Sequence, residues 1–230
     1  TPATVVQYMV NVLNPESGDK QFLDPACGSG GMFVQAARYM HKHNASSSDM
    51  MKFRCYGVEK EEDTVKLAKM NLLLNNIRGE IREANSFYSD PYGVNECGHF
   101  DYVMANPPFN VDEVVLEKVK DQRRFNEYGV PAKKSKSTKK ASDKKETVPN
   151  ANYLWISYFA TALNETGKAA LVMANSASDA SGSELEIRKK LIQKGIVKQM
   201  VSLPSNMFTS VTLPATLWFF DNQKQYSNKK

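Results

Sequence analysis

The stretch Asp101-Tyr102-Val103-Met104-Ala105-Asn106-Pro107-Pro108-Phe109 joins an apolar run, typical of a buried strand, to an abrupt end. Two consecutive prolines prevent the strand from continuing beyond Ala105, because proline has no N–H group and restricts the residue before it. Asn106 and Phe109 are therefore expected at the carboxyl edge of a strand, where ligands bind in an open parallel α/β sheet. Asparagine and proline are also common in turns, so an ordinary turn is the simpler alternative.

The Asn106–Phe109 tetrapeptide suits a planar, conjugated amine such as the exocyclic amine of adenine. Such a nitrogen is a poor nucleophile because its lone pair is delocalised into the ring. If the Asn106 side-chain oxygen and the Pro107 carbonyl each accept one N–H group, they stabilise charge that develops in the transition state. Phe109 offers a face on which an extruded base can stack. We therefore predict methyl transfer, with Asn106, Pro107, Pro108 and Phe109 as the catalytic residues.

A second ligand-binding pattern lies nearer the amino terminus. A predicted strand at 21–24 leads into the loop Pro25-Ala26-Cys27-Gly28-Ser29-Gly30-Gly31, and a helix follows. This order brings backbone N–H groups and the positive end of a helix towards a ligand, and the glycines permit unusual backbone angles. The spacing is not GxGxxG and is not followed by Gly-Lys-Ser/Thr, which disfavours dinucleotide and P-loop sites. A purely structural tight turn is the alternative.

Glu59 ends the second predicted strand, at about 53–58. A carboxylate at the end of the neighbouring strand can accept hydrogen bonds from both hydroxyl groups of a ribose. The competing interpretation is an ordinary acidic residue at a helix amino terminus, because Glu61, Glu62 and Asp63 follow directly.

The rest of the chain alternates between strands and helices. Further strands are predicted at 81–84, 102–105, 169–174, 196–203 and 216–220, and helices at 2–13, 62–74, 152–165 and 184–194. Thr1 is expected to cap the first helix, and Gly167 to close the helix at 152–165. The predicted fold is α/β, a doubly wound, mostly parallel seven-stranded sheet of Rossmann-like type with an antiparallel final strand.

The charge of the chain is concentrated in one segment. The 230 residues have a net charge of +5, and residues 113–150 alone hold eleven Lys/Arg and six Asp/Glu. Within this segment, Lys133–Lys145 contains seven lysines and too few apolar side chains to order itself. We expect one catalytic domain, 1–230, with a basic flexible insertion at about 113–150 that contacts phosphate. A solvated lysine-rich loop is the alternative.

Other features exclude several classes of protein. No apolar run approaches the roughly 18 residues needed for a membrane span, so no membrane partner is expected. The three cysteines form no CxxC pair and the three histidines do not cluster with them, which predicts a reduced, cytoplasmic protein without a metal site. The chain opens at Thr1-Pro2 without methionine, which is expected of an excerpt or a processed product.

Taken together, these patterns resemble the amino-group DNA methyltransferases that use S-adenosylmethionine. Within that group the chain is similar to the catalytic core of the modification subunit of type I restriction-modification systems. The resemblance rests on Thr1-Pro2 before an apolar helix, on the 22–31 and 106–109 motifs, on Glu59, and on the later runs 186–191 and 203–208. These match in order over almost the whole chain.

The resemblance implies a role for each matching residue. Thr1 and the loop residues Asp24, Ala26, Cys27, Gly28, Ser29, Gly30 and Gly31 would hold the methionine part of the cofactor, and Glu59 its ribose. Asn85 stands where the family usually has an aspartate that contacts the cofactor's adenine amine, and it can accept that hydrogen bond without a charge. Phe208 would pack on the flipped target base, although a core aromatic is an equal alternative.

The resemblance also implies partners, namely DNA, a specificity subunit and a restriction subunit. Adenine-N6 methylation of DNA is the leading hypothesis. A methyltransferase acting on an RNA base or on protein glutamine is an alternative, because the tetrapeptide suits any planar amine or amide. A non-catalytic subunit that binds the cofactor or DNA is the other.

Overall fold

One seven-stranded sheet organises the computed structural model, which describes residues 1–43, 45–96, 98–132, 146–208 and 214–223. Its strands are β1 (Gln21–Asp24), β2 (Arg54–Glu59), β3 (Gly79–Glu83), β4 (Phe100–Ala105), β5 (Leu163–Ala174), β6 (Val197–Ser202) and β7 (Ala215–Asp221). They lie in the order β3-β2-β1-β4-β5-β7-β6. β7 is antiparallel to β5 and β6, and the other pairs are parallel. The predicted fold class and the antiparallel final strand are confirmed.

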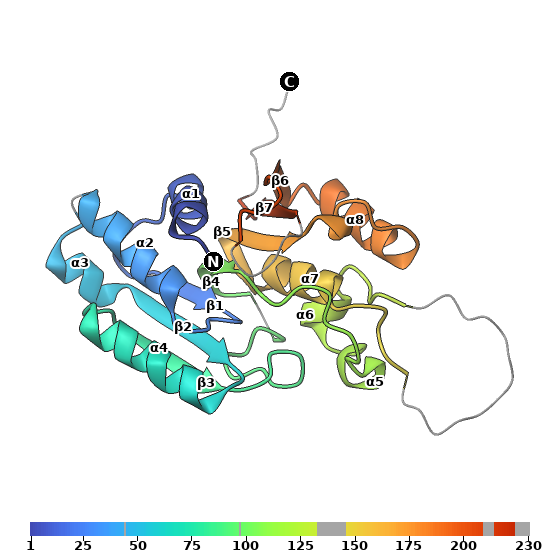
Figure 1. The fold of residues 1–230 in the computed structure, drawn as a ribbon, viewed down its shortest axis with the longest axis horizontal. Coiled ribbons are helices and arrows are strands. Elements are labelled where there is room, and N and C mark those ends of the chain that lie inside the picture. Colours follow the sequence, from blue (N-terminus) through green and yellow to red (C-terminus); the bar gives the residue numbers. More distant parts are fainter. Residues whose placement is uncertain (44, 97, 133–145, 209–213, 224–230) are drawn as a thin grey trace, which may run out of the picture.

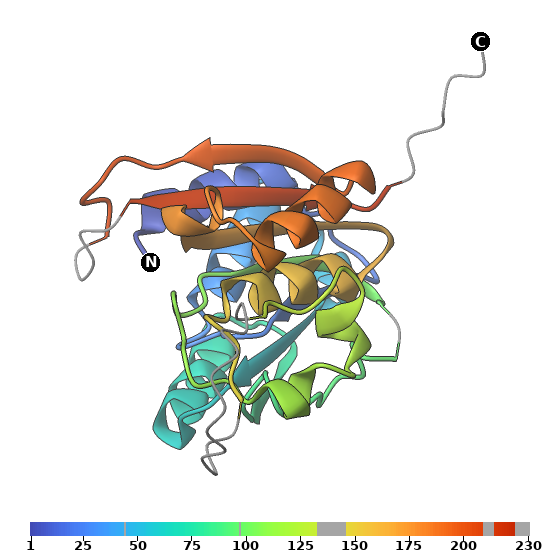
Figure 2. The ribbon, with the colours of Figure 1, turned by 90° about the vertical axis from the view of Figure 1, so that its right-hand side faces the viewer.

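Two helical layers cover the sheet (Figure 1). The first consists of α1 (Ala3–Leu13), α2 (Gly31–Lys42) and α4 (Glu62–Leu74), with the short, unpredicted α3 (Ser47–Lys52) beside them. The second contains α7 (Asn152–Ala162), α8 (Ser183–Gln193) and the short helices α5 (Leu116–Val119) and α6 (Arg123–Asn126), and it faces the viewer in Figure 2. Each layer encloses its own apolar core against one face of the sheet.

Burial explains why the two layers have different sequence patterns. α1 buries a single stripe, consisting of Val5, Val6, Met9, Val10 and Leu13, as the spacing predicts. By contrast, every residue of α7 is buried. A helix that is enclosed on all sides needs no polar face, so its amphipathic signal is weak.

The predicted end of the helix at 152–165 is wrong. α7 ends at Ala162 and β5 begins at Leu163, which pairs with Phe100 of β4. Gly167 lies inside β5, where a Cβ atom would be 2.6 Å from the Phe100 carbonyl oxygen. The glycine therefore permits a close approach between two strands and does not close a helix.

Thr1 does not cap α1. Pro2 occupies the N-cap position, and the structure shows no side-chain cap hydrogen bond there. The Thr1 hydroxyl instead accepts a hydrogen bond from Asn106 at the sheet edge. A contact with a distant loop therefore takes the place of the expected local one.

The centre of the sheet is a topological switch point. β1 and β4 are neighbours, but the chain leaves β1 towards β2 and leaves β4 towards β5 on the opposite side. Loops that diverge from adjacent strand ends leave a crevice, and ligands bind there in sheets of this kind. Asp24, the last residue of β1, and Asn106, which follows β4, both lie at this crevice.

The insertion is anchored on either side of its lysine-rich part. Val115 and Thr147 form an antiparallel bridge, and the Leu116 N–H group donates to the Glu146 carbonyl oxygen at 2.9 Å. Residues 133–145, on which the prediction of flexibility and phosphate contact rests, lie outside the described residues. Among the described helices, none has the length and apolar character required to cross a bilayer.

Candidate active site

The glycine loop turns tightly between β1 and α2. Gly28 and Gly30 have positive φ values of +52° and +79°, which a residue with a side chain adopts only under strain. The Cys27 N–H group donates to the Val58 carbonyl oxygen at 3.0 Å, and the Gly30 N–H group to the Cys27 carbonyl oxygen at 2.8 Å. These bonds tie the loop to β2 and direct the start of α2 at Gly31 towards the crevice.

Two hollows meet at this loop. The first has a volume of about 330 Å³, and its lining includes Thr1, Asp24, Ala26, Cys27, Gly28, Gly31 and Asn106. The second has a volume of about 350 Å³, and its lining includes Ala26, Glu59, Asn85, Phe87, Pro108 and Trp155. Ala26 lies between the two, so together they form one elongated site across the switch point.

Glu59 is held by backbone donors at the end of β2. Its Oε2 atom accepts from the Gly28 N–H group at 3.0 Å. Its Oε1 atom accepts from the N–H groups of Lys60 and Glu61 at 2.7 and 3.0 Å. Neutral backbone donors orient the carboxylate without neutralising it, and the contact with Gly28 links it to the glycine loop. Glu59 ends β2, three residues before α4 begins, and it lines the second hollow, so the ribose contact stays a prediction.

Asp24 is almost completely buried, with 1% of its surface exposed. Burial raises the pKa of its carboxyl group to about 8, against a hydrogen bond from the Ala26 N–H group that lowers it, and the nearby Glu59 charge raises it further. Burial likewise raises the pKa of the Cys27 thiol, which favours a packing role over that of a nucleophile. The first hollow thus contains a carboxyl group that is neutral at low pH and can ionise near neutrality.

The raised pKa of Asp24 predicts a loss of stability as the pH rises. Between about pH 4, near the usual pKa of aspartate, and about pH 8, the folded chain retains a proton that the unfolded chain has lost. The free energy of unfolding therefore falls in this window, by about 1.4 kcal/mol per pH unit from this group. Denaturant unfolding at pH 5, 6 and 7 gives the free energy of unfolding of the wild type and of Asp24→Asn, and the two dependences on pH should differ by that slope. Equal slopes in the two proteins would contradict the prediction.

Asn106 follows β4 and reaches the amino terminus of the chain. Its Nδ2 atom donates to the Thr1 hydroxyl oxygen at 2.7 Å, across 105 residues of sequence. The bond engages the amide nitrogen and orients the side chain, so that Oδ1 is the atom suited to accept from a substrate. Pro107 is buried, Pro108 is exposed, and Phe109 is half-buried against the apolar cores of both layers.

Asn85 forms a local turn at the rim of the second hollow. Its Oδ1 atom accepts from the Phe87 N–H group at 2.9 Å, a type of turn that asparagine and aspartate both form. The next residue, Ser86, is buried and donates from its hydroxyl to the Pro25 carbonyl oxygen at 2.5 Å. This bond fixes the segment after β3 against the glycine loop.

The structure brings together most of the predicted site residues but not all. Ser29, Gly30, Pro107, Phe109 and Phe208 line neither hollow. Gly30 packs on α4, the Ser29 carbonyl oxygen accepts from Asn71, and Phe208 is half-buried against the first-layer core. Within the described ranges, no group of three or more His, Cys, Asp or Glu residues could hold a metal ion.

Trp155 is the site residue that the sequence analysis missed. It lies on α7, is 3% exposed, and lines the second hollow, where its ring centroid is 4.6 Å from that of Phe87. Its Nε1 donor is buried without a hydrogen-bond partner among the described residues. Because this nitrogen is itself buried, the hollow is lined by the ring of Trp155 and not by its N–H group. The only sequence signal was an aromatic side chain in a largely apolar helix, which is equally typical of a core.

Comparison with known proteins identifies related sequences over the whole chain. A family model described as N-6 DNA Methylase matches residues 1–230. The type I restriction enzyme MjaIX methylase subunit of Methanocaldococcus jannaschii is 36% identical over 97% of this chain. The HindI methylase subunit of Haemophilus influenzae is 34% identical over 98%. The chain spans 37% and 46% of the lengths of these two relatives.

Solved structures show the same fold. A type I restriction-modification methyltransferase subunit from Streptococcus thermophilus superposes with a TM-score of 0.80 at 21% identity, over 98% of this chain and 45% of that one. A modification subunit of a putative type I restriction enzyme from Vibrio vulnificus gives a TM-score of 0.73 at 24% identity, over 96% and 44%. At these identities the likeness concerns the fold.

Proposed function

Because this chain belongs to the N-6 DNA methylase family, we propose that it methylates the N6 amine of adenine in DNA with S-adenosylmethionine as the methyl donor. The observation that carries the proposal is the position of Asn106. Its side chain lines the hollow that contains Asp24 and the glycine loop, and Pro108 lines the adjoining hollow with Glu59. A polarising amide therefore lies beside a site suited to the cofactor.

The two hollows fit the two halves of S-adenosylmethionine. The first, with Thr1, Asp24 and the glycine loop, would hold the methionine part, because its carboxyl group and backbone donors suit an amino acid. The second would hold the adenosine part, with the Glu59 carboxylate accepting from the ribose hydroxyls. The Asn85 side chain, at the rim of this hollow, can accept from the adenine amine, and the Trp155 ring lines the same hollow. The cofactor's sulfonium supplies an activated methyl group.

On the substrate side, the chain's own groups would activate the target amine. The Asn106 Oδ1 atom and the Pro107 carbonyl oxygen accept its two N–H groups, which frees the lone pair of the nitrogen for attack. Phe109 stacks on the extruded base. The proton leaves to solvent after transfer. The role of Phe208 against the flipped base stays a prediction, because Phe208 is half-buried against the first-layer core and lines neither hollow.

The relatives' names suggest an assembly. Both are described as methylase subunits of type I restriction enzymes. We therefore propose that this protein acts on DNA as the modification subunit of such a system, together with a specificity subunit and a restriction subunit.

Mass spectrometry of modified products tests this function against its alternatives. The protein, expressed from its complete gene with its neighbouring subunits, is incubated with isotope-labelled S-adenosylmethionine and with DNA, RNA or total protein from a methylation-free host. We expect labelled N6-methyladenine in DNA alone. Label in RNA or in glutamine would identify a different acceptor. Cofactor binding without transfer to any acceptor would identify a non-catalytic subunit.

A further inference from the structure

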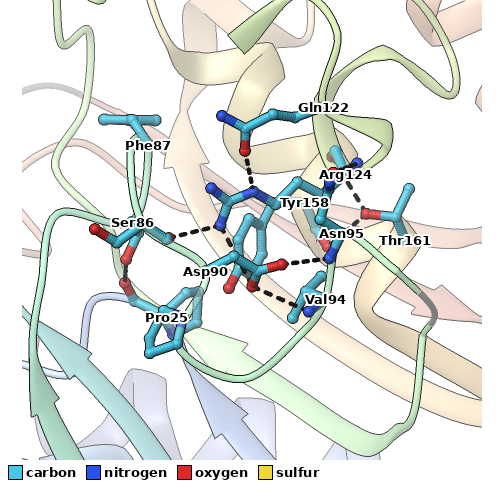
Figure 3. A network of polar contacts seen from close by, with 12 residues as sticks. Pro25, Ser86, Phe87, Asp90, Val94, Asn95, Gln122, Arg124, Tyr158 and Thr161 are labelled. Carbon is cyan, nitrogen blue, oxygen red and sulfur yellow. Dashed lines mark hydrogen bonds and ion pairs between the residues drawn. The ribbon is translucent and has the colours of Figure 1, made fainter. Parts of the chain in front are cut away.

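Arg124 is a buried arginine in α6, on the side of the second hollow. Its side chain is 1% exposed. Its Nε atom donates to Gln122 Oε1 at 2.8 Å, and its Nη1 atom donates to the Ser89 carbonyl oxygen at 2.9 Å (Figure 3). Nη1 also lies 3.6 Å from Asp90 Oδ1, and the guanidinium carbon lies 5.5 Å from the centre of the Tyr158 ring. Burying a charged group is costly unless its partners are well placed, so this arrangement is specific.

Three of the residues that contact Arg124, Ser89, Asp90 and Asn95, belong to one loop, residues 84–95, which follows β3. The Asp90 carboxylate closes this loop by accepting from the N–H groups of Val94 and Asn95 at 3.0 and 2.5 Å. The Arg124 backbone N–H group donates to the Asn95 side-chain oxygen at 3.4 Å. Arg124 thus holds the 84–95 loop through the carbonyl of Ser89, the carboxylate of Asp90 and the amide of Asn95.

The other end of the 84–95 loop forms one wall of the second hollow. Asn85, Ser86 and Phe87 line the hollow, and the hydrogen bond from Ser86 to Pro25 joins the loop to the glycine loop (Figure 3). Any shift of the loop at Ser89 and Asp90 would therefore change the position of Asn85 and Phe87.

Arg124 also contacts α7, whose Trp155 lines the second hollow beside Phe87, with the two ring centroids 4.6 Å apart. One turn further along the same helix, Tyr158 packs on the guanidinium. The Thr161 hydroxyl oxygen lies 3.2 Å from the Arg124 carbonyl oxygen, although its one proton has a nearer acceptor, the Ser157 carbonyl oxygen at 2.9 Å. Arg124 therefore contacts both the 84–95 loop and α7, the two segments that carry the neighbouring lining residues Phe87 and Trp155.

We propose that Arg124 is a positioning residue that sets how the 84–95 loop lies against α7 and thereby the fit of the cofactor's adenosine half. This inference rests on the proposed function, because it concerns the binding of S-adenosylmethionine. Arg124 contacts neither hollow directly, and it acts through the 84–95 loop and α7. A purely stabilising arginine would change the melting temperature and leave cofactor affinity unchanged.

Arg124→Met tests the proposal, because methionine keeps an unbranched side chain but removes the charge and all donors. We expect the Kd and KM for S-adenosylmethionine to rise about tenfold, while kcat at saturating cofactor changes less than about threefold. Arg123→Met is the matched control. Arg123 is the neighbouring arginine on α6, its side chain is 44% exposed, and its ion-pair partner is Glu127. The Arg123→Met substitution should leave the Kd, the KM and kcat unchanged.

A double-mutant cycle with Asn85→Ala separates positioning from general destabilisation. If Arg124 acts by placing the wall that carries Asn85, the losses of affinity should be non-additive, and the double variant should bind about as weakly as the weaker single variant. If Arg124→Met does not fold, Asp90→Asn, which removes the charge and one of the two acceptors for the Val94 and Asn95 N–H groups, should also raise the Kd.

The outcomes distinguish this inference from the proposed function. The inference alone would be overturned if the wild type binds S-adenosylmethionine and the Kd values of Arg124→Met and Asp90→Asn lie within twofold of the wild-type value. Additive losses in the cycle would overturn it as well. Wild-type protein that fails to bind the cofactor in calorimetry would overturn the proposed function, and this inference with it.

Discussion

Asn106→Ala should lower the rate of methyl transfer about a thousandfold, because a preorganised polar group aimed at developing charge contributes that order of magnitude. The variant loses the Oδ1 acceptor and the hydrogen bond to Thr1. Cofactor affinity should change less than about threefold, since the side chains of the adenosine hollow, including Glu59, remain in place. Single-turnover transfer of labelled methyl groups to DNA measures the first effect, and titration calorimetry the second.

Asn126→Ala is the control for this experiment. Asn126 is an exposed asparagine whose Nδ2 atom bonds to the Lys120 carbonyl oxygen, and it lines neither hollow. Its removal should leave both measurements unchanged. An equal loss of transfer and of cofactor binding in Asn106→Ala would show that Asn106 supports the cofactor site, and would contradict its assignment to the target amine.

Glu59→Ala should weaken cofactor binding about a hundredfold. Two charge-assisted hydrogen bonds to the ribose, at about 1.5–3 kcal/mol each, exceed the roughly 2.8 kcal/mol that this factor requires. The structure adds a second cause, because the same carboxylate holds the Gly28 N–H group and thus the glycine loop. Glu59→Gln should also bind weakly, since its amide NH₂ would face backbone N–H donors on one side.

Glu61 provides the matched control for Glu59. It lies two residues further along, its side chain is 71% exposed, and its ion pair with Lys60 spans 3.5 Å. An exposed pair of this kind contributes little, so Glu61→Ala should bind the cofactor like the wild type. If Glu59→Ala retained an affinity within threefold of the wild type, Glu59 would serve only as an acidic residue ahead of the amino terminus of α4.

The main elements of the fold could be predicted from local sequence. β1, the glycine loop and the end of β4 are predicted correctly because each depends on a few neighbouring residues. The errors occurred where a distant backbone competes with a local signal. The sequence predicts that Gly167 closes a helix, but it lies in β5, because the sheet brings the Phe100 carbonyl oxygen close to it. The sequence predicts that Thr1 caps a helix, but its hydroxyl accepts a hydrogen bond from Asn106.

Some features of the candidate site likewise follow from local sequence, and others depend on tertiary contacts. By itself, the sequence determined where strands end, where glycines free the backbone, and that Asn106-Pro107-Pro108-Phe109 stands at a strand end, because these effects act within a few residues. Only the tertiary structure decided that Asp24 is buried, that Glu59 holds Gly28, and that Trp155 faces the second hollow. The sheet order places β1 between β2 and β4. Contacts between residues far apart in sequence follow from that order, which no local pattern specifies.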